Sequence, residues 1–150
     1  MILVDTNILA RSAQPGHSQY ATAVASVEAL RLSSEGLCVV PQVLYEYWVV
    51  ATRPEAKNGL GMTAIEADAD LIAILQQFHL YRDERAILDG WRKLVVQYQV
   101  LGKNAHDAHL LAAMQRHHIS HILTFNVSDF RRFAGIQVLD PHQVAAKAAP

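Results

Sequence analysis

Four carboxylates in this chain occupy positions where a surface charge is not the expected role. Asp5 directly follows the apolar run Ile2-Leu-Val4, and Glu46 interrupts a segment that is otherwise almost entirely apolar. Asp107 lies in Ala105-His-Asp-Ala-His-Leu110, and Asp129 in Thr124-Phe-Asn-Val-Ser-Asp-Phe130. Carboxylates that gather without basic partners repel one another, and a hard divalent cation such as Mg²⁺ or Mn²⁺ neutralises them. The four acids are therefore candidate metal ligands and candidate catalytic residues.

Each acid also has an ordinary structural explanation. Asp107 would complement a helix dipole, and Asp129 would cap a turn. Asp5 would begin a turn, and Glu46 would pair with an arginine. Taken singly, these explanations are at least as good as a functional role. They account less well for all four acids meeting at one edge of a sheet.

Short apolar segments alternate with longer helical patterns along the chain. Strands are expected at 2–4, 37–40, 79–81, 121–125 and 136–139. Helices are expected at 19–34 after Ser18, at 41–51 and at 105–117. Further helices are expected from a Thr63–Glu66 capping box to about 78, from Asp83 to about 98 and after Asp140, and a helical turn is expected at 8–11. Residues 126–129 are expected as a loop and 130–133 as a turn.

This alternation predicts an α/β sandwich with a central, mostly parallel sheet. The carboxyl ends of parallel strands and the starts of the following helices meet at one edge. Asp5, Asp107 and Asp129 are therefore expected to converge there. A buried Glu46 would be costly unless it is paired or bound to a cation.

Length and composition narrow the class of protein. The 150 residues, 51% of them hydrophobic, predict one folded domain over 1–150. A net charge of -1 does not favour nucleic-acid binding unless a local patch or a metal supplies positive charge. Cys38, the single cysteine, is interpreted as a small buried hydrophobe. No apolar run is long enough for a membrane span and no basic leader is present, so a cytoplasmic protein with no membrane contact is expected.

The order and near-family spacing of these motifs resemble the PIN-domain ribonucleases, in particular the VapC-type toxins of bacterial toxin–antitoxin pairs. The resemblance covers most of the chain and is carried by Val4-Asp-Thr-Asn-Ile-Leu9, Glu46, His106-Asp-Ala-His-Leu-Leu-Ala-Ala113 and Thr124-Phe-Asn-Val-Ser-Asp-Phe130. It implies a PIN-like three-layer α/β/α sandwich. It also implies an Mg²⁺- or Mn²⁺-binding quartet of Asp5, Glu46, Asp107 and Asp129, supported through hydrogen bonds by Thr6, Asn7, Thr124 and Asn126.

The same resemblance implies a function. The protein would be a metal-dependent endoribonuclease and a toxin, cleaving structured RNA such as tRNA or ribosomal RNA to leave a 5′-phosphate and a 3′-hydroxyl. A VapB-type antitoxin would cover the acidic cleft with its C-terminal segment. A homodimer is also implied, to which Tyr45, Tyr47 and Trp48 would contribute unless they belong to the core. Phosphate contacts are expected from basic loop residues, for which the candidates are Arg11, Arg53, Lys57, Lys103, Arg131 and Arg132.

Other classes of protein stay open on the sequence alone. A phosphatase of the haloacid dehalogenase type also begins with an Asp after an apolar strand, but it needs a second Asp where this chain has Asn7. A response-regulator-like receiver gathers acids at a sheet edge, but its phospho-acceptor Asp and its Lys are not evident. A binding module with an inactive acidic site is the remaining alternative. His106 and His109 are interpreted as solvated or capping residues because they lack zinc-site spacing.

Overall fold

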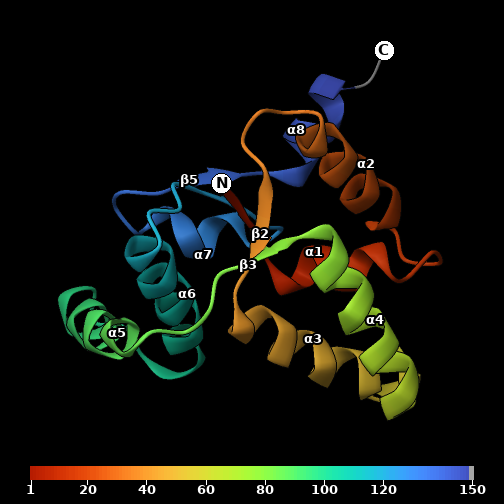
Figure 1. Ribbon diagram of the computed structural model, residues 1–150, viewed down its shortest axis with the longest axis horizontal. Coiled ribbons are helices and arrows are strands. Elements are labelled where there is room, and N and C mark those ends of the chain that lie inside the picture. The colour runs from red at the N-terminus through yellow and green to blue at the C-terminus, as the bar shows by residue number, and fades with distance from the viewer. Residues whose placement is uncertain (149–150) are drawn as a thin grey trace.

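The computed structural model describes residues 1–148 and is built on a five-stranded sheet in the order β3-β2-β1-β4-β5 (Figure 1). The strands are β1 (Ile2–Val4), β2 (Leu37–Val39), β3 (His79–Leu80), β4 (His121–Leu123) and β5 (Gln137–Leu139). Every pairing is parallel, and Ile2 lies between Leu37 on β2 and His121 on β4. The predicted parallel α/β architecture is confirmed, with strands slightly shorter than expected.

Helices fill all the connections between strands. α1 (Thr6–Ser12) and α2 (Tyr20–Arg31) follow β1, while α3 (Pro41–Thr52), the 3-10 turn η1 (Glu55–Lys57) and α4 (Ala64–Gln77) follow β2. α5 (Arg85–Gln97), the 3-10 turn η2 (Gly102–Asn104) and α6 (Ala105–Arg116) follow β3. α7 (Val127–Arg131) joins β4 to β5, and α8 (Pro141–Ala148) packs against α2.

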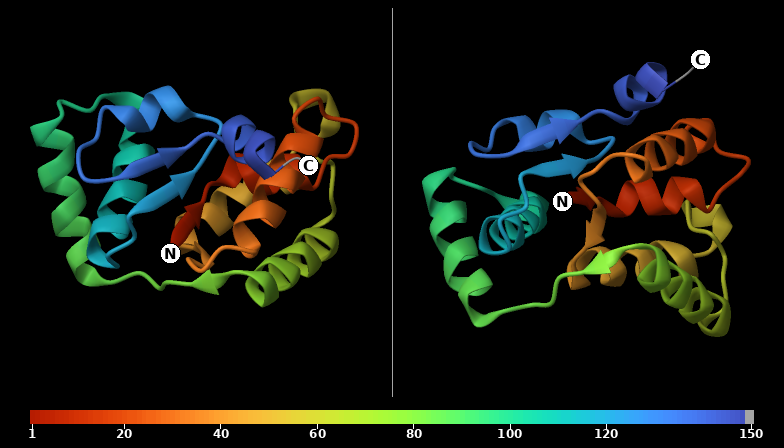
Figure 2. Two further views of the ribbon diagram at one scale, coloured as in Figure 1. Left: turned by 90° about the horizontal axis from the view of Figure 1, so that it is seen from above. Right: turned by 45° about the horizontal axis from the view of Figure 1, so that its top comes forward.

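The strand order reverses between β1 and β4. The chain moves outward from β1 to β3, crosses back to β4 beside β1, and then continues to β5. Because such crossovers are right-handed, the helices after β1 and β2 cover one face of the sheet and those after β3 and β4 cover the other. Figures 1 and 2 show α1 to α4 on one side and α5 to α7 on the other. In open α/β sheets this reversal is where ligands bind, at the carboxyl ends of the strands.

The central strands and the helices against them form the core. All three residues of β1 and of β2 are buried, which is why their sequences are continuously apolar rather than alternating. Cys38 is fully buried as predicted, and burial raises the pKa of its thiol to about 12. Tyr47 also belongs to the core, at 2% exposure, whereas Tyr45 is 66% exposed. Within residues 1–148 no helix combines the length and apolar character that crossing a membrane requires.

Some helix boundaries were predicted correctly because their signals are local. Pro41 stands in the first turn of α3, and the Thr63–Glu66 capping box is formed in full. Others were wrong: α2 begins after Gln19 rather than Ser18, and α5 after Glu84 rather than Asp83. Neither observed cap residue bonds its side chain to the helix, so the sequence carries no capping signal there.

Three further predictions about helices are corrected by the structure. Residues 127–131, expected as loop and turn, form α7, because Phe130 is a buried anchor that together with Phe133 enters the core. The almost entirely apolar sequence of α3 suggests a helix buried on all sides, but Tyr45 and Val49 leave one side of it exposed. α1 is a full helix rather than a turn, since Asp5 caps it by accepting a hydrogen bond from the Thr6 amide.

Candidate functional site

Asp5 lies at the carboxyl end of β1, beside the point where the strand order reverses. It is only 5% exposed. Its Oδ1 accepts a hydrogen bond from the Thr6 amide at 2.7 Å, and its Oδ2 accepts from Thr124 Oγ1 at 2.6 Å and from Asn7 Nδ2 at 2.9 Å. Both carboxylate oxygens are therefore held in place by donors from β1's own continuation and from the end of β4.

The predicted supporting residues form one hydrogen-bonded network around Asp5. Thr124 Oγ1 accepts from Asn7 Nδ2 at 3.1 Å and from the Asn126 amide at 3.0 Å. Asn7 Oδ1 accepts from the Phe125 amide at 3.1 Å. Among the hydrogen bonds formed within residues 1–148, Asn126 contributes only its backbone amide. This network ties the ends of β1 and β4 together at the edge where a ligand would bind.

Glu46 is brought to the same network by α3. It is half-buried, its Oε2 accepts from Thr6 Oγ1 at 3.1 Å, and its Oε1 accepts from Gln42 Nε2 at 2.8 Å. Thr6 therefore lies between two of the predicted ligands, because its amide bonds to Asp5 and its hydroxyl to Glu46. In the described part of the chain no arginine pairs with Glu46, so the pairing considered for it from sequence is not formed.

Asp107 and Asp129 approach from the other face of the sheet. Asp107 is half-buried in the first turn of α6, and Asp129 is exposed in the first turn of α7. Burial raises the pKa of Asp107, and the negative charges of Asp129 and Glu46 raise it further. The positive charges of Arg132 and His106 act in the opposite direction on that pKa. Asp107 is thus an electrostatic neighbour of acids on both α3 and α7.

The raised pKa of Asp5 also indicates that negatively charged side chains lie near one another at this site. Burial raises the pKa of Asp5 to about 6, against the hydrogen bonds from Thr124 and Thr6, which lower it. The charges of Glu46 and Asp107 add to the increase. Acids separated by more than 40 residues in the chain are therefore close enough in the fold to repel one another.

The donor chemistry of this cluster fits a hydrated hard cation. Among residues 1–148, no three His, Cys, Asp or Glu side chains lie close enough to hold one ion directly. Mg²⁺ does not require such a cage, because it retains several waters and binds through one or two carboxylates. The acids supply oxygen donors only, which suits Mg²⁺ or Mn²⁺ rather than zinc.

The six basic candidates separate into two groups. Lys103 lies in η2 directly before α6, and Arg131 and Arg132 end α7, so these three flank the helices that carry Asp107 and Asp129. Arg132 acts on the pKa of Asp107 and also lies over the Phe133 ring, 4.8 Å from its centroid.

The remaining basic candidates are engaged or lie further away. Arg11 is bonded to Gln14 and Gln19. Arg53 and Lys57 follow the far end of α3, and Arg53 stands about 10 Å along the helix axis from Glu46.

Two residues at the site were not predicted to act there. Gln42, one turn before Glu46 on α3, donates to Glu46 and to the His106 carbonyl oxygen. His109, interpreted from sequence as solvated or capping, places Nδ1 2.6 Å from Gln42 Oε1. Gln42 and Glu46 are the polar residues of an otherwise apolar and aromatic segment, four positions apart. That spacing is the signal that would have identified Gln42.

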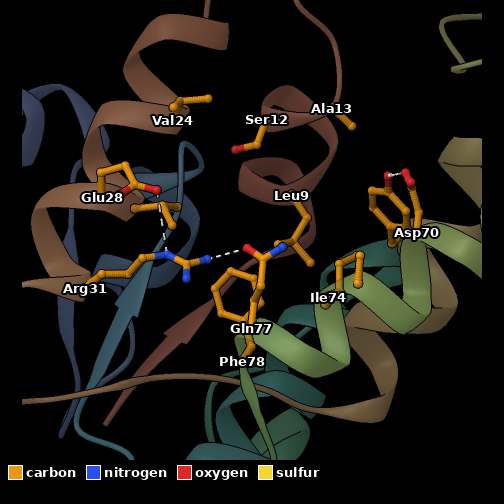
Figure 3. Close-up of a pocket in the computed structure, with 13 residues that line it drawn as sticks. Leu9, Ser12, Ala13, Val24, Glu28, Arg31, Asp70, Ile74, Gln77 and Phe78 are labelled. Carbon is orange, nitrogen blue, oxygen red and sulfur yellow. Dashed lines mark hydrogen bonds and ion pairs between the residues drawn. The ribbon is translucent and has the colours of Figure 1, made fainter.

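A separate hollow of about 330 Å³ lies among α1, α2, α3 and α4 and includes none of the four acids (Figure 3). The Tyr47 hydroxyl donates to Asp70 Oδ2 at 2.6 Å on its wall, so Asp70 is not the solvated residue that its spacing from Glu66 suggests. Figure 3 shows the Ser12 side chain from α1 directed toward this hollow. The buried Ser12 hydroxyl has no hydrogen-bond partner within residues 1–148.

The PIN domain family model matches residues 2–136, and the chain therefore belongs to the PIN-domain family. No curated protein sequence matches the chain. Its fold is also that of several solved toxins. VapBC2 from Rickettsia felis, bound to a DNA fragment from its promoter, superposes with a TM-score of 0.66 at 15% identity, covering 93% of this chain and 100% of that one.

Two further solved structures show the same likeness of fold. A toxin–antitoxin complex from Klebsiella pneumoniae gives a TM-score of 0.63 at 23% identity, over 94% of this chain and 98% of that one. VapC20 from Mycobacterium tuberculosis, a toxin that cleaves the sarcin–ricin loop, gives a TM-score of 0.66 at 17% identity, covering 91% of this chain and 99% of that one. The PIN-like α/β fold expected from the motifs is confirmed.

Proposed function

We propose that this protein is an Mg²⁺-dependent endoribonuclease that acts as the toxin of a toxin–antitoxin pair. The observation that carries the proposal is that Asp5 at the end of β1 and Glu46 on α3 share the donor Thr6 at the reversal point of the sheet, with Asp107 of α6 close enough to raise the pKa of Asp5. No Lys or Arg forms an ion pair with any of the four acids within residues 1–148. Membership of the PIN-domain family supports a nuclease.

The proposed ligands are Asp5, Glu46, Asp107 and Asp129. A bound Mg²⁺ would lower the pKa of a coordinated water and stabilise the charge that develops on the scissile phosphate. Thr6, Asn7 and Thr124 hold the Asp5 carboxylate in one orientation before any ligand arrives, so less ordering is needed on binding. Asp129 is exposed and accepts no side-chain hydrogen bond within residues 1–148, which suits it to orient a water or accept its proton.

We assign the first phosphate contacts to the basic residues beside α6 and α7. Arg132 lies within electrostatic reach of Asp107, and its stacking on Phe133 holds the guanidinium without consuming its hydrogen-bond donors. Lys103 and Arg131 extend the same positive rim. A local rim of this kind supplies the positive charge that a chain of net charge -1 lacks overall.

Structured RNA is the proposed substrate class, by analogy with the loop-cleaving toxin VapC20, whose fold this chain shares. The proposed partner is an antitoxin, since structural neighbours were solved in toxin–antitoxin complexes. A basic side chain from that partner would neutralise the acid cluster in place of the cation. A homodimer is also proposed, and the exposed Tyr45 and Val49 on α3 are apolar surface that a second copy would cover.

The proposal is tested with the purified protein and structured RNA in Mg²⁺. We expect internal cleavage that stops in EDTA, returns with Mn²⁺, and leaves 5′-phosphate ends. Asp107→Asn should lower kcat/KM at least about 100-fold, because the cation contributes several kcal/mol in the transition state. Asp89→Asn, which changes an exposed acid on α5, is the matched control.

Two outcomes would point to the alternative classes. Turnover of p-nitrophenyl phosphate without RNA cleavage would indicate a phosphatase. That class is disfavoured by Asn7, because its amide donates to Asp5 and cannot act as a second acid. Mn²⁺ binding without cleavage of any RNA would indicate a binding module.

A further inference from the structure

Gln42 makes the hydrogen bonds that join α3 to α6 within residues 1–148. Its Nε2 donates to Glu46 Oε1 at 2.8 Å and to the His106 carbonyl oxygen at 3.0 Å, and its Oε1 lies 2.6 Å from His109 Nδ1. No other hydrogen bond, from backbone or side chain, connects these two helices in the described chain. One amide thus links the helix that carries Glu46 to the helix that carries Asp107.

The orientation of the Gln42 amide follows from its partners. The carbonyl oxygen of His106 and a carboxylate oxygen of Glu46 face one end of the amide. The carbonyl oxygen is always an acceptor, and the carboxylate oxygen is an acceptor only while Glu46 is ionised. The nitrogen must therefore occupy that end, because a flipped amide would place its oxygen against two acceptors. Oε1 then faces His109, so His109 Nδ1 must donate. The amide has one stable orientation, with its oxygen and nitrogen both bonded.

These bonds decide where the Glu46 carboxylate points. Gln42 donates to Oε1 and Thr6 donates to Oε2, so each oxygen of the carboxylate accepts one hydrogen bond. Asp107 has no side-chain hydrogen bond of its own within residues 1–148, and its position depends on that of α6. Gln42 is bonded to the carbonyl of His106, the residue immediately before Asp107. The same amide therefore orients one acid and fixes the backbone beside the other.

We propose that Gln42 is a positioning residue that orients Glu46 and sets its placement relative to Asp107, so that cation binding depends on it. This inference rests on the proposed function, because it takes the acid cluster to be a cation site. Groups that orient metal ligands from behind commonly change metal affinity 10- to 100-fold when they are removed. His109 supports Gln42 from the far end of the amide and contributes less, since its loss leaves the Gln42–Glu46 bond in place.

The test uses the full chain and measures Mn²⁺ binding directly, by titration calorimetry, together with the rise in Tm that Mn²⁺ produces. Gln42→Met keeps the length and packing of the side chain and removes all three contacts. We expect about a 10- to 100-fold weaker Mn²⁺ affinity, a smaller Mn²⁺-induced rise in Tm, a reduced kcat and a KM for RNA within about twofold of wild type. His109→Phe should weaken Mn²⁺ binding by about threefold or less.

The control is Gln76→Met, which makes the same change at an exposed position of α4 with no hydrogen bond within residues 1–148, and it should leave every quantity unchanged. Wild-type Mn²⁺ affinity in Gln42→Met would overturn the positioning role. So would a drop in Tm measured in EDTA with no change in Mn²⁺ affinity, because that pattern marks a purely structural bridge. If Gln42→Met does not fold, Gln42→Asn, whose amide falls one carbon short, carries the same expectation and the same contradiction.

The two proposals fail in different ways. If the wild-type protein binds no Mn²⁺ and cleaves no RNA, the proposed function is wrong. If the wild-type protein does both and the Gln42 variants match it, only the positioning role of Gln42 is wrong.

Discussion

Thr124 Oγ1 donates a 2.6 Å hydrogen bond to Asp5 Oδ2 across 119 positions of sequence. The bond joins the carboxyl ends of β1 and β4, which are neighbours because the strand order reverses between them. The Thr124 hydroxyl also accepts from Asn7 and from the Asn126 amide. One side chain therefore both joins the ends of two neighbouring strands and orients Asp5, the most buried candidate ligand.

Thr124→Val should destabilise the protein and impair the site. The change leaves Asp5 short of a donor and Asn7 short of an acceptor, which costs about 2 kcal/mol and lowers Tm by roughly 4–8 °C. It should also raise the pKa of Asp5 further, because the Thr124 hydrogen bond lowers that pKa. Thermal unfolding measures the loss. Thr124→Ser keeps the hydroxyl and should recover most of it, and equal losses in the two variants would contradict the role given to the hydroxyl.

The stability of the metal-free protein should carry a pH dependence that originates at Asp5. Its pKa is about 6 in the folded protein and 3.8 when unperturbed, so the folded state binds more protons between these values. The contribution of Asp5 to the free energy of unfolding therefore decreases as pH rises through that range. Above the folded pKa the decrease is complete and amounts to about 3 kcal/mol. Denaturant unfolding of wild type and Asp5→Asn in EDTA measures it.

Asp5→Asn supplies the reference curve for that experiment. The wild-type free energy of unfolding should decrease relative to the variant between about pH 4 and pH 7. Saturating Mg²⁺ should remove most of this decrease, because the cation favours the ionised carboxylate. A difference curve that is flat with pH, or one that rises, would contradict the raised pKa of Asp5.

Asp107→Asn should stabilise the metal-free protein while lowering kcat/KM for RNA cleavage at least about 100-fold. Burial and the charges of Asp129 and Glu46 disfavour the ionised Asp107 in the folded state, and the neutral amide removes that repulsion. We expect a higher Tm than wild type at neutral pH in EDTA, and a smaller gain on adding Mg²⁺. Differential scanning calorimetry with and without Mg²⁺ distinguishes this from simple damage. A Tm below that of wild type in EDTA would contradict the expectation that repulsion between the acids destabilises the metal-free protein.

The sheet and the acidic edge were predictable because their signals are local and strong. A continuous apolar run that ends in Asp5 marks a buried strand and its carboxyl end, and parallel topology then brings such ends together. The start of α3 followed from Pro41 in the same way. These features depend on residue type and order, which the sequence states directly.

The rest depended on contacts between distant segments. α7 was not predicted because Asn126, Ser128 and Asp129 are typical loop residues, and only the burial of Phe130 holds the segment as a helix. Gln42 stands four positions before Glu46, but its contact with His109, 67 positions away, has no signal in the sequence. The spacing of Asp70 from Glu66 suggests a solvated residue, yet Asp70 accepts a hydrogen bond from the Tyr47 hydroxyl of another helix. No periodicity in the sequence encodes these pairings.

Two serines with buried hydroxyl groups should respond oppositely to replacement by alanine. Ser12 Oγ is buried beside the hollow among α1, α2, α3 and α4 without a hydrogen-bond partner in residues 1–148, so the folded state pays for removing it from water. Ser12→Ala removes that cost and places a better helix former at the end of α1, so we expect stability to increase by about 1 kcal/mol.

Ser26 is the matched case, since it is fully buried on α2 and its hydroxyl donates to the Ala23 carbonyl oxygen at 2.9 Å. Ser26→Ala leaves a small void and removes a satisfied bond, so we expect no gain and a loss of up to about 1 kcal/mol. Urea unfolding of both variants gives the comparison. If Ser12→Ala loses as much stability as Ser26→Ala, the Ser12 hydroxyl has a partner in solution, and an ordered water in the hollow would be the source.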